Sequence, residues 1–398
     1  MIKLLLFSTN IYIFNLHYIF IVKSGGFQKM KSKIIISIAI VTILGLSLIG
    51  QAGATHFTSN QILIGRGTLY VGGAGPGNHS TISEAIANAT QGDIIFVYNG
   101  TYAENLNIGK KITIMGDDKD ITIIQGVTGD EQVINIVSSF VTIEGFTIRG
   151  ATLDQDAIHV FSLMEDNVIT DNIFESCAYG IWLQITSKRV TVNYNVFDGC
   201  EFTAIRLVES DRNTIAHNEI MDCGEYAISL ESASIQNNIS YNTLIDNYGG
   251  IHLSGASGQN DILYNRISNC ALEAILIEGL SNSNIVQYNN ITDNYVGLAL
   301  GSSSQNIIES NNFQGSTMEG LLLTSSSNNI VNTNNFIDNN RHAAFRFSSR
   351  NSWDANYWDN WVGIKFTAPL FQLFPKAIGG ILRINLDRNP QLTPYSMP

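Results

Sequence analysis

Residues 195–264 read NVFDGCEFTAIRLVESDRNTIAH, NEIMDCGEYAISLESASIQNNISY and NTLIDNYGGIHLSGASGQNDILY, three variants of one segment in succession. Each variant begins with Asn, carries an Ile followed two residues later by Leu, and reaches a second Asn near its end. The opening Asn recurs at steps of 22 to 24 residues, at Asn172, Asn195, Asn218, Asn242, Asn265, Asn289, Asn311 and Asn334. Such a period indicates a repeat protein, because one short unit cannot bury its apolar face alone and must stack on its neighbours.

The repeat predicts an all-β, three-sided coil. Each copy holds short β-type runs of three to five residues that break at Gly, Asn or Asp. In segments such as Gly180–Leu183 and Gly250–Leu253, the Ile and Leu point inward and the residue between them points outward. Successive coils pair in parallel at a spacing of about 4.8 Å. The period of about 23 residues gives about eleven coils between residues 93 and 350.

Inside the coil we expect like residues to stack on like residues. An Ile ladder should line each face, and the recurring Asn should form a ladder at one corner. Asn suits such a corner because it tolerates left-handed backbone angles and because its amide can bond to the amides above and below.

Both ends of the solenoid are expected to be capped, because an open end exposes unpaired strand edges and an uncovered core. Ser80–Ala89 is typical of an amphipathic helix, in which Thr81 and Glu84 form a capping box. At the other end, three tryptophans fall within nine residues, at Trp353, Trp358 and Trp361. The expected organisation is a lead-in with the cap helix at 55–92, the β-helix at 93–350 and a Trp-rich C-terminal cap at 351–398.

Residues 1–54 predict a secretory leader. They contain five Lys and no acidic residue; Lys31 and Lys33 precede the apolar run Ile34–Ile49, and Ala52–Ala54 is an A-x-A cleavage site. The run is short for a membrane span, which needs roughly 20 apolar residues. This order fits translation from Met30, and an uncleaved N-terminal anchor is the alternative. The expected localisation is therefore secreted or on the extracellular cell surface.

Charge excludes two classes of partner. The chain has 22 Lys and Arg and 34 Asp and Glu. From Thr55 onward, 17 basic residues (22 minus five) remain against all 34 acidic ones, which gives a net charge of −17. Nucleic acid and anionic lipid both need clustered Lys and Arg. We therefore expect no nucleic-acid partner, and membrane contact only through an uncleaved leader.

Both ends of the chain carry a resemblance to a known group. The segments concerned are Tyr70–Gly73, Thr81–Ile86, Gly92–Ile95, Gly100–Asn105 and Asn356–Trp361. They resemble the N-terminal cap, first coil and C-terminal signature of NosD-like proteins of the carbohydrate-binding and sugar-hydrolase class, in their archaeal secreted or surface form. The resemblance covers roughly Leu69–Asn389 and implies a right-handed parallel β-helix. It implies no single function, because the group mixes copper-delivery accessory proteins, surface-layer proteins, polysaccharide lyases and hydrolases.

One outward column on the Gly-Ile-x-Leu strand holds the candidate carbohydrate-binding residues. Coil by coil it reads His159, Trp182, Arg206, Ser229, His252, Leu276, Ala299, Leu322 and Arg346. The resemblance implies that this face is the floor of a substrate groove, and the first five residues span about 20 Å at the strand spacing. Trp182 can stack on a sugar ring, and Arg206 can bind a uronate carboxylate. The alternative is an ordinary solvent-facing column of mixed composition.

Catalysis has weaker support. Acidic residues flank the column at Asp154, Asp156, Glu201, Glu209, Glu225 and Glu231. Glycoside hydrolysis needs two carboxylates about 5–10 Å apart, and Glu201 with Glu225 on neighbouring coils is one such candidate pair. The Asn-Thr-Asp, Gly-His-Gly and Arg-Ile-Lys runs of pectinolytic relatives do not occur here. The favoured function is therefore a structural or adhesive protein that binds polysaccharide or envelope partners. A polysaccharide lyase or glycoside hydrolase acting in the groove is the alternative, with its catalytic residues unassigned.

The four cysteines raise a second alternative, copper delivery. Each falls five residues after a ladder Asn, at Cys177, Cys200, Cys223 and Cys270, where other coils carry Asn or Ser. A thiolate ladder could hold Cu(I), but buried Cys also fills a small ladder position, and no nearby His or Met completes a metal site. His159 and His252 lie four coils apart, about 19 Å, which is too far to share an ion. We expect no metal site and no cofactor.

A further column stands just before the ladder Asn. It reads Asp171, Tyr194, His217, Tyr241, Tyr264, Tyr288, Ser310 and Thr333. Its aromatic members could bind a glycan or a partner, since Tyr offers a flat apolar face and a hydroxyl. The favoured interpretation is that stacked Tyr rings stabilise adjacent strands, as cross-strand aromatic pairs do.

Overall fold

The computed structural model describes residues 3–7, 10–15, 18–23, 26–29, 67–127, 132–152, 155–361, 376–379, 384–387 and 389–396. The chain divides into two compact units, Met1–Ile64 and Gly65–Pro398. In the first unit, an antiparallel sheet has the order β1 (Lys3–Phe7), β2 (Asn10–Asn15), β3 (Tyr18–Lys23) and β4 (Gly26–Lys29). The apolar run Ile34–Ile49 and the predicted cleavage site Ala52–Ala54 lie outside the described residues. Among the residues described, no helix has the length and hydropathy to cross a membrane.

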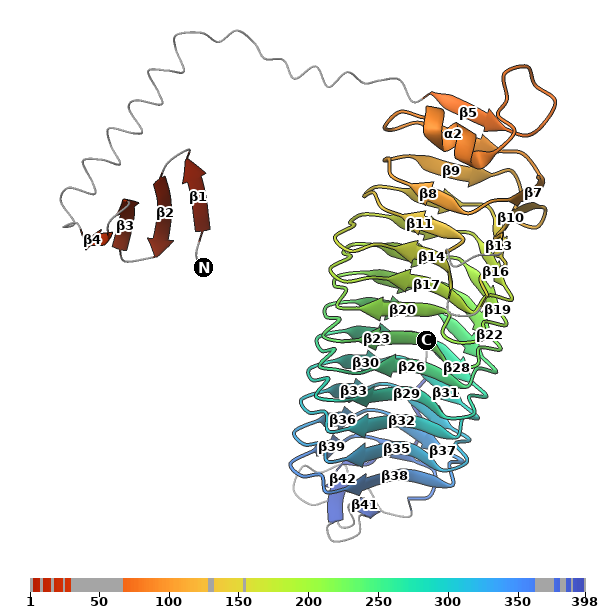
Figure 1. The fold of residues 1–398 in the computed structure, drawn as a ribbon. Coiled ribbons are helices and arrows are strands. Elements are labelled where there is room, and N and C mark those ends of the chain that lie inside the picture. The colour runs from red at the N-terminus through yellow and green to blue at the C-terminus, as the bar shows by residue number, and fades with distance from the viewer. Residues whose placement is uncertain are drawn as a thin grey trace. The chain divides into compact units, whose positions relative to one another are not determined.

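The second unit is a solenoid built from three parallel sheets (Figure 1). The first sheet contains β5 (Thr68–Val71), β6 (Ile94–Val97), β9 (Thr113–Gly116), β12 (Thr142–Glu144), β15 (Val168–Thr170), β18 (Thr191–Asn193), β21 (Thr214–Ala216), β24 (Asn238–Ser240), β27 (Asp261–Leu263), β30 (Ile285–Gln287), β33 (Ile307–Glu309), β36 (Ile330–Asn332) and β39 (Ser352–Asp354). The second contains β7 (Gly100–Ala103), β10 (Thr122–Gln125), β13 (Thr147–Arg149), β16 (Ile173–Glu175), β19 (Val196–Asp198), β22 (Glu219–Met221), β25 (Thr243–Ile245), β28 (Arg266–Ser268), β31 (Asn290–Thr292), β34 (Asn312–Gln314), β37 (Asn335–Ile337) and β40 (Tyr357–Trp358).

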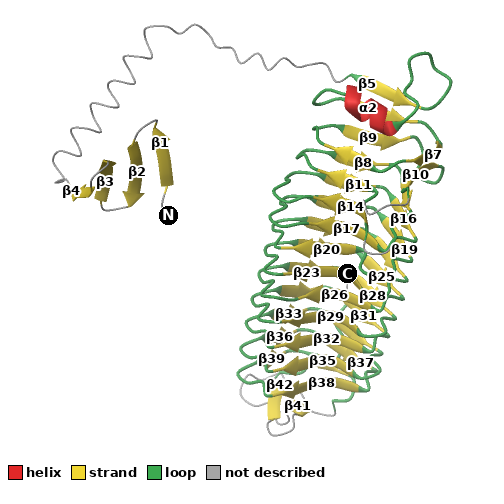
Figure 2. Cartoon of the chain, in the orientation of Figure 1, coloured by secondary structure: helices red, strands yellow, loops and turns green. Residues whose placement is uncertain are grey.

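The third sheet faces the reader in Figure 1 and carries the candidate site. It contains β8 (Leu106–Ile108), β11 (Ile134–Ile136), β14 (Asp156–Val160), β17 (Tyr179–Leu183), β20 (Ile205–Val208), β23 (Tyr226–Glu231), β26 (Gly249–Leu253), β29 (Glu273–Glu278), β32 (Val296–Gly301), β35 (Glu319–Thr324) and β38 (Arg341–Arg346). Each strand pairs in parallel with its counterpart one coil away, so the predicted three-sided, all-β coil of about 23 residues is confirmed (Figure 2).

The core consists of apolar side chains stacked in columns along the axis. The Ile and Leu side chains that point inward on the three sheets, such as Ile181, Leu183 and Ile215, are buried, as the inward and outward alternation predicts. Aromatic residues stack in the same way on the second sheet, where the rings of Phe174 and Phe197 lie 4.4 Å apart and those of Phe313 and Phe336 lie 5.2 Å apart. One coil therefore buries its apolar residues against the next, and each coil needs both neighbours for a closed core.

The predicted N-terminal cap helix is present as α2 (Ile82–Asn88). Thr81 is its N-cap and accepts a hydrogen bond from the backbone N–H of Glu84 at 3.1 Å. Both ends of the helix are also bound to the first coil. The carboxylate of Glu104 accepts from the N–H groups of Ile82 and Ser83, and the ammonium of Lys110 donates to three carbonyls at the helix C-terminus. These charges match the sign of the partial charge at each helix end.

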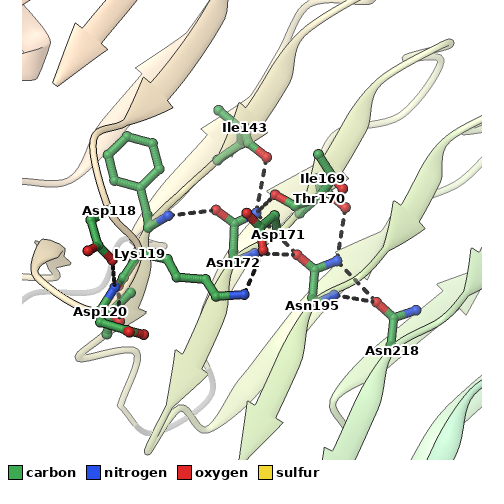
Figure 3. A network of polar contacts seen from close by, with 12 residues as sticks. Asp118, Lys119, Asp120, Ile143, Ile169, Thr170, Asp171, Asn172, Asn195 and Asn218 are labelled. Carbon is green, nitrogen blue, oxygen red and sulfur yellow. Dashed lines mark hydrogen bonds and ion pairs between the residues drawn. The ribbon is translucent and has the colours of Figure 1, made fainter.

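The recurring Asn forms a buried, hydrogen-bonded ladder, as the sequence predicts. Figure 3 shows its first rungs, in which Nδ2 of Asn172 donates to Oδ1 of Asn195 at 3.1 Å and Nδ2 of Asn195 donates to Oδ1 of Asn218 at 3.1 Å. The same carbonyl oxygens accept from the backbone N–H of the preceding rung, and each Nδ2 reaches a strand carbonyl such as that of Ile169. The ladder thus satisfies both side-chain and main-chain groups at a corner that excludes water.

The left-handed residue at this corner is not the ladder Asn, as we expected, but the residue before it. Tyr194, His217 and Tyr241 have φ values of 56°, 56° and 57°. This conformation directs the following Asn side chain into the interior, where its amide is bonded. A left-handed residue other than Gly costs about 1–2 kcal/mol, so the buried amide contacts offset that cost at each rung.

A second corner carries two ladders that were not predicted from the sequence. A second Asn ladder joins the third sheet to the first, and Nδ2 of Asn213 donates to Oδ1 of Asn237 at 3.1 Å. Val190 occupies the position of the ladder Asn one coil before Asn213 and interrupts this ladder. On the coil before Val190, Nδ2 of Asn167 has no hydrogen-bond partner among the described residues. Beside it runs a Ser ladder, in which the N–H of Ser210 donates to Oγ of Ser234. Every corner of the solenoid is therefore filled by a stacked polar column.

The C-terminal segment closes the open end of the core. Trp358 stacks on Phe336 with ring centroids 4.3 Å apart, and both Trp353 and Trp358 are buried. Strands β41 (Lys376–Gly379) and β42 (Ile384–Asp387) form an antiparallel hairpin, and the buried Asp387 accepts three hydrogen bonds from the last ladder residue, Asn356, and from the indole of Trp358. The Asn ladder thus ends on a carboxylate that only accepts hydrogen bonds.

Removing one rung tests the ladder. Asn242→Ala removes the acceptor for the backbone N–H of Asn218 and the donor for the carbonyl of Ile215. Each orphaned buried group costs about 1–3 kcal/mol, so the free energy of unfolding should fall by about 2–6 kcal/mol, measured by chemical denaturation. Gln259→Ala, which removes an exposed amide of the same type, is the matched control and should change it by less than about 0.5 kcal/mol. Equal losses in both variants would contradict this account.

Candidate functional site

The strand register brings the five candidate residues into one outward column on the third sheet. His159 lies opposite Trp182, Trp182 opposite Arg206, Arg206 opposite Ser229, and Ser229 opposite His252. The column therefore crosses β14, β17, β20, β23 and β26 as predicted. One coil earlier, Asn135 on β11 extends it.

The N-terminal end of the column is an aromatic cluster. The imidazole of His159 lies between two rings, with its centroid 4.4 Å from that of Phe161 and 4.6 Å from that of Trp182. Phe161, Leu163 and Ile185 are exposed beside it. On the other side, the guanidinium of Arg206 lies 5.5 Å from the Trp182 ring centroid. A polar floor and an apolar wall thus meet at this end.

Asp156 and His159 are buried polar residues at the same place. They are only 3% and 5% exposed, although both lie on the outer side of the solenoid. Oδ2 of Asp156 and Nδ1 of His159 are 3.2 Å apart, an ion-pair distance. Among the described residues, Nε2 of His159, Nε1 of Trp182 and Oδ1 of Asn135 have no hydrogen-bond partner. Buried polar atoms are nearly always bonded, so three unpartnered atoms in one cluster indicate a place prepared for a ligand or for ordered water.

Burial raises the pKa of Asp156 above its ordinary value. The contact with His159 and the more distant charge of Arg206 lower that pKa and only partly oppose the effect of burial. The carboxyl group therefore holds a proton more readily here than in water, a property that is common in catalytic and binding sites.

The C-terminal half of the column is a set of closed ion pairs. Nε and Nη2 of Arg206 donate to the carboxylate of Glu231 at 3.0 and 2.9 Å, and this fork holds the pKa of Arg206 above its usual value. The hydroxyl of Ser229 donates to the same carboxylate at 3.1 Å. Nε2 of His252 lies 3.2 Å from Oε1 of Glu278. These residues lie on the outer face of the third sheet with their charges already paired.

Tyr226 connects this half to a second outward column. Its ring stacks on that of His252 at 4.8 Å, and its hydroxyl donates to Oε2 of Glu273 at 2.8 Å. Burial is the first cause that raises the pKa of Tyr226, and the neighbouring carboxylates raise it further. The sequence did not identify Tyr226, Glu273, Glu278 and Phe161 as site residues, because they lie outside the outward column of the Gly-Ile-x-Leu strand. The alternation of Ile134, Asn135 and Ile136 would have identified Asn135.

Some predicted neighbours lie elsewhere. Leu322 pairs with Ala344 and Thr324 with Arg346, so Arg346 is outside the column in which we placed it. The carboxylate of Glu225 accepts from the hydroxyl of Thr203 at 3.2 Å, and Glu201 and Glu225 are both exposed. Asp156 lies on strand β14 itself and not on a loop. Asp154 lies outside the described residues.

The cysteines occupy a ladder position. All four are buried, free thiols, and Sγ of Cys177 donates to the carbonyl of Ile148, whereas on another coil Nδ2 of Asn247 donates to the equivalent carbonyl of Ile220. The thiol thus replaces the amide at this third corner, as the structural interpretation predicts. Burial raises the pKa of Cys177 and of Cys270 to about 12. Within the described ranges, no group of three or more His, Cys, Asp and Glu side chains is arranged to hold a metal ion.

The aromatic column before the Asn ladder is a continuous stack. Successive ring centroids from Tyr194 through His217, Tyr241 and Tyr264 to Tyr288 are 4.8 to 5.0 Å apart, and the rings are within 13° of parallel. Each inner ring covers the faces of its neighbours. A sugar therefore has no open inner face to stack on, and the geometry agrees with the stabilising interpretation.

Comparison with known families identifies the fold. The model of the family described as "Right handed beta helix region" matches residues 110–267 and 262–368. This match agrees with the three-sided parallel coil predicted from the repeat and with the right-handed β-helix that the resemblance implies, which is thereby confirmed. The finer resemblance to archaeal NosD-like proteins stays a prediction.

Known proteins with a similar fold are sugar-active. The A-module of the mannuronan C-5 epimerase AlgE6 from Azotobacter vinelandii superposes with a TM-score of 0.62 at 14% identity, covering 69% of this chain and 87% of that module. DFA-IIIase from Arthrobacter chlorophenolicus A6, in complex with GF2, superposes with a TM-score of 0.61 at 15% identity, covering 73% and 94%. In sequence, probable pectinesterase 56 of Arabidopsis thaliana is 36% identical over 76 residues. That match spans 17% of this chain and about a quarter (26%) of the length of the pectinesterase.

The raised pKa of Asp156 predicts a pH effect. Because the folded state binds this proton more tightly than the unfolded state, folding stability should fall as the pH rises from the ordinary value of 3.8 through the raised one. Asp156→Asn should flatten that fall and raise the melting temperature at neutral pH. Denaturation of both proteins over a pH series measures it, with the exposed Asp198→Asn as control. A parallel pH dependence in wild type and Asp156→Asn would contradict the prediction.

The cysteine ladder predicts inert thiols. Because burial raises the pKa of Cys177 and Cys270 to about 12, alkylation by iodoacetamide at pH 8 should be negligible in the folded protein, and all four thiols should react in denaturant. Mass spectrometry counts the alkyl groups. We also expect no Cu(I) to survive competition with a strong chelator. One retained equivalent that is lost in Cys200→Ser would show that the ladder binds metal.

Proposed function

Because the chain belongs to the right-handed β-helix family, we propose that it binds a glycan along the third sheet, in the groove formed by His159, Trp182, Arg206, Ser229 and His252. The observation that carries the proposal is the cluster of buried but unpartnered polar atoms on Asn135, His159 and Trp182, beside the pair formed by Asp156 and His159. A sugar hydroxyl both donates and accepts hydrogen bonds, so a row of hydroxyls suits this mixture of carboxylate, imidazole and indole groups.

The shape and chemistry of the groove support this choice of ligand. Carbohydrate sites combine flat apolar surfaces for the faces of sugar rings with polar groups for their hydroxyls. Trp182 and Phe161 provide the apolar surfaces, and Ser229 and His252 continue the polar row along the rod. A column with one residue per coil suits an extended polymer, because its contacts repeat at the strand spacing of about 4.8 Å.

The known neighbours support the same class of ligand. One is named for mannuronan, one was crystallised in complex with GF2, and one is named as a pectinesterase. At their levels of identity or coverage, these likenesses support the fold and only suggest the ligand class. The proposal therefore rests on the groove itself.

We further propose that the protein acts outside the cell, secreted or on the surface, where it binds polysaccharide or envelope partners in a structural or adhesive role. The predicted leader within residues 1–54 and the net charge of −17 from Thr55 onward (17 basic minus 34 acidic residues) support this proposal. A rigid rod with binding residues along one face suits attachment better than the enclosure of a small substrate.

Turnover is the second candidate, and one observation favours it. Asp156 has a raised pKa and lies 3.2 Å from His159, so the pair could transfer a proton to or from a bound sugar. This would make the protein a polysaccharide lyase or a glycoside hydrolase. The copper-delivery alternative has no such support, because the four buried cysteines occupy a ladder position in which Sγ of Cys177 donates to the carbonyl of Ile148.

The proposal predicts that Trp182 is essential for glycan binding. Trp182→Ala removes the ring that contacts His159 and Arg206, and buried aromatic contacts of this kind are worth on the order of 1–3 kcal/mol. Affinity for the best glycan found on an array should fall by about 10- to 100-fold in isothermal titration calorimetry. Phe347→Ala, which removes an exposed aromatic ring on the last coil, should leave affinity unchanged.

The same samples separate binding from turnover. Reducing-sugar release and unsaturated-product absorbance should stay at background in the wild type. Turnover that is lost in Asp156→Asn would replace the binding role with the enzymatic one. A wild type that retains no glycan on the array would remove both proposals.

A further inference from the structure

The guanidinium of Arg206 is already paired with a carboxylate. Nε and Nη2 of Arg206 form a fork on the carboxylate of Glu231 at 3.0 and 2.9 Å, and Ser229 donates to that carboxylate as well. Arg206 also lies against the face of Trp182. A uronate carboxylate could take the same bidentate position only by displacing Glu231, an exchange of one bidentate pair for another with no net gain.

The remaining charges along the groove are mostly negative. Strands β14, β17, β20, β23, β26 and β29 contain one Lys or Arg, which is Arg206, against four acidic residues, Asp156, Glu231, Glu273 and Glu278. The two imidazoles, His159 and His252, each face one of these carboxylates at 3.2 Å. Even with both imidazoles protonated, the count is three positive against four negative groups.

The flanking residues do not reverse this sign. Glu225 accepts a hydrogen bond from the hydroxyl of Thr203, and Tyr226 donates a hydrogen bond to Glu273. The nearest described guanidinium on the corner that follows β17, Arg189, is paired with Glu165 and Asp166. The six strands of this face therefore carry more acidic than basic residues.

From this arrangement we propose that the groove selects glycans that carry no carboxylate and discriminates against polyuronates. The inference rests on the proposed glycan-binding function and specifies its ligand class. A uronate chain laid along the column would place a carboxylate beside the carboxylates of Glu231, Glu273 or Glu278, while the charge of Arg206 is already balanced by Glu231. Like charges in a partly desolvated groove disfavour binding. Neutral sugars bring hydroxyls alone, and these can bond to the free lone pairs of the same carboxylates.

The test uses matched probes that differ only in charge. Hexagalacturonate is compared with its fully methyl-esterified form, and oligomannuronate with the corresponding mannose oligomer, by calorimetry on the full protein at low salt. Within each pair, the carboxylated member should bind at least about tenfold more weakly, and the difference should shrink as salt screens the groove. On a wider array, glycans without carboxylates should account for the binding.

Glu231→Gln tests the role of the ion pair. It frees Arg206 and removes one negative charge, so the difference between carboxylated and neutral probes should narrow several-fold. Glu219→Gln removes an exposed carboxylate on β22 of the second sheet, lowers the net negative charge equally and should leave the difference unchanged. Thermal denaturation of each variant confirms that it is folded.

The outcomes separate the two proposals. Binding of a polyuronate as tightly as its neutral counterpart, or an unchanged preference in Glu231→Gln, would overturn the selectivity and leave glycan binding intact. If no glycan of either kind is bound by the wild type, the glycan-binding function itself is wrong.

Discussion

The structure depends on one constraint, which is that backbone groups at the corners of a coil must be hydrogen-bonded where water cannot reach. Hydrogen bonds within the sheets satisfy the backbone groups of the strands. A chain that turns three times per coil leaves further backbone N–H and C=O groups at every turn, and these need other partners. Stacked Asn, Ser and Cys side chains satisfy them, and one Asn carbonyl accepts from both the main chain and the side chain of the rung before it. This requirement explains the period of the sequence, because each polar rung must face another polar rung one coil away.

The same constraint explains where function can reside. Inward-pointing and ladder residues contact the equivalent residues one coil away, so packing determines which side chains these positions can hold. Outward positions on the third sheet are not constrained in this way, and their residues differ from coil to coil, from His159 and Trp182 to Leu276 and Ala299. Polar groups left buried without partners there, as on His159, cost stability. Because the fold does not need these unpartnered groups, their cost in stability is better explained by the binding of a ligand.

The sequence predicted most of the fold and only part of the site. The Asn period and the Ile-x-Leu pattern were sufficient for the coil, the Asn ladder and the candidate column, because neighbours within a column are related by a fixed shift along the chain. Contacts between columns were not predictable. The pairing of Arg206 with Glu231 joins residues 25 positions apart on different columns, and it depends on which rotamer each long side chain adopts.

The errors of register and conformation have similar physical causes. In the segment His342–Phe347, alternation permits either Ala343 or Phe345 as the partner of Leu321, and the structure selects Ala343. The left-handed residue was placed on the ladder Asn because Asn tolerates that conformation. The structure places it on the preceding Tyr, His or Thr, since the turn must come before the amide that it directs inward.

The carboxylate of Asp387 shows that the Asn ladder has a direction. Every rung offers its carbonyl toward the N-terminal neighbour and its donors toward the C-terminal one, so the last rung, Asn356, is left with donors only, and an acid completes it. Nothing within the column itself sets how many rungs precede that acid. The length of the solenoid can therefore change in evolution when gene duplication or deletion adds or removes whole coils. Each coil changes the length by one strand spacing, and both terminal caps stay chemically unchanged.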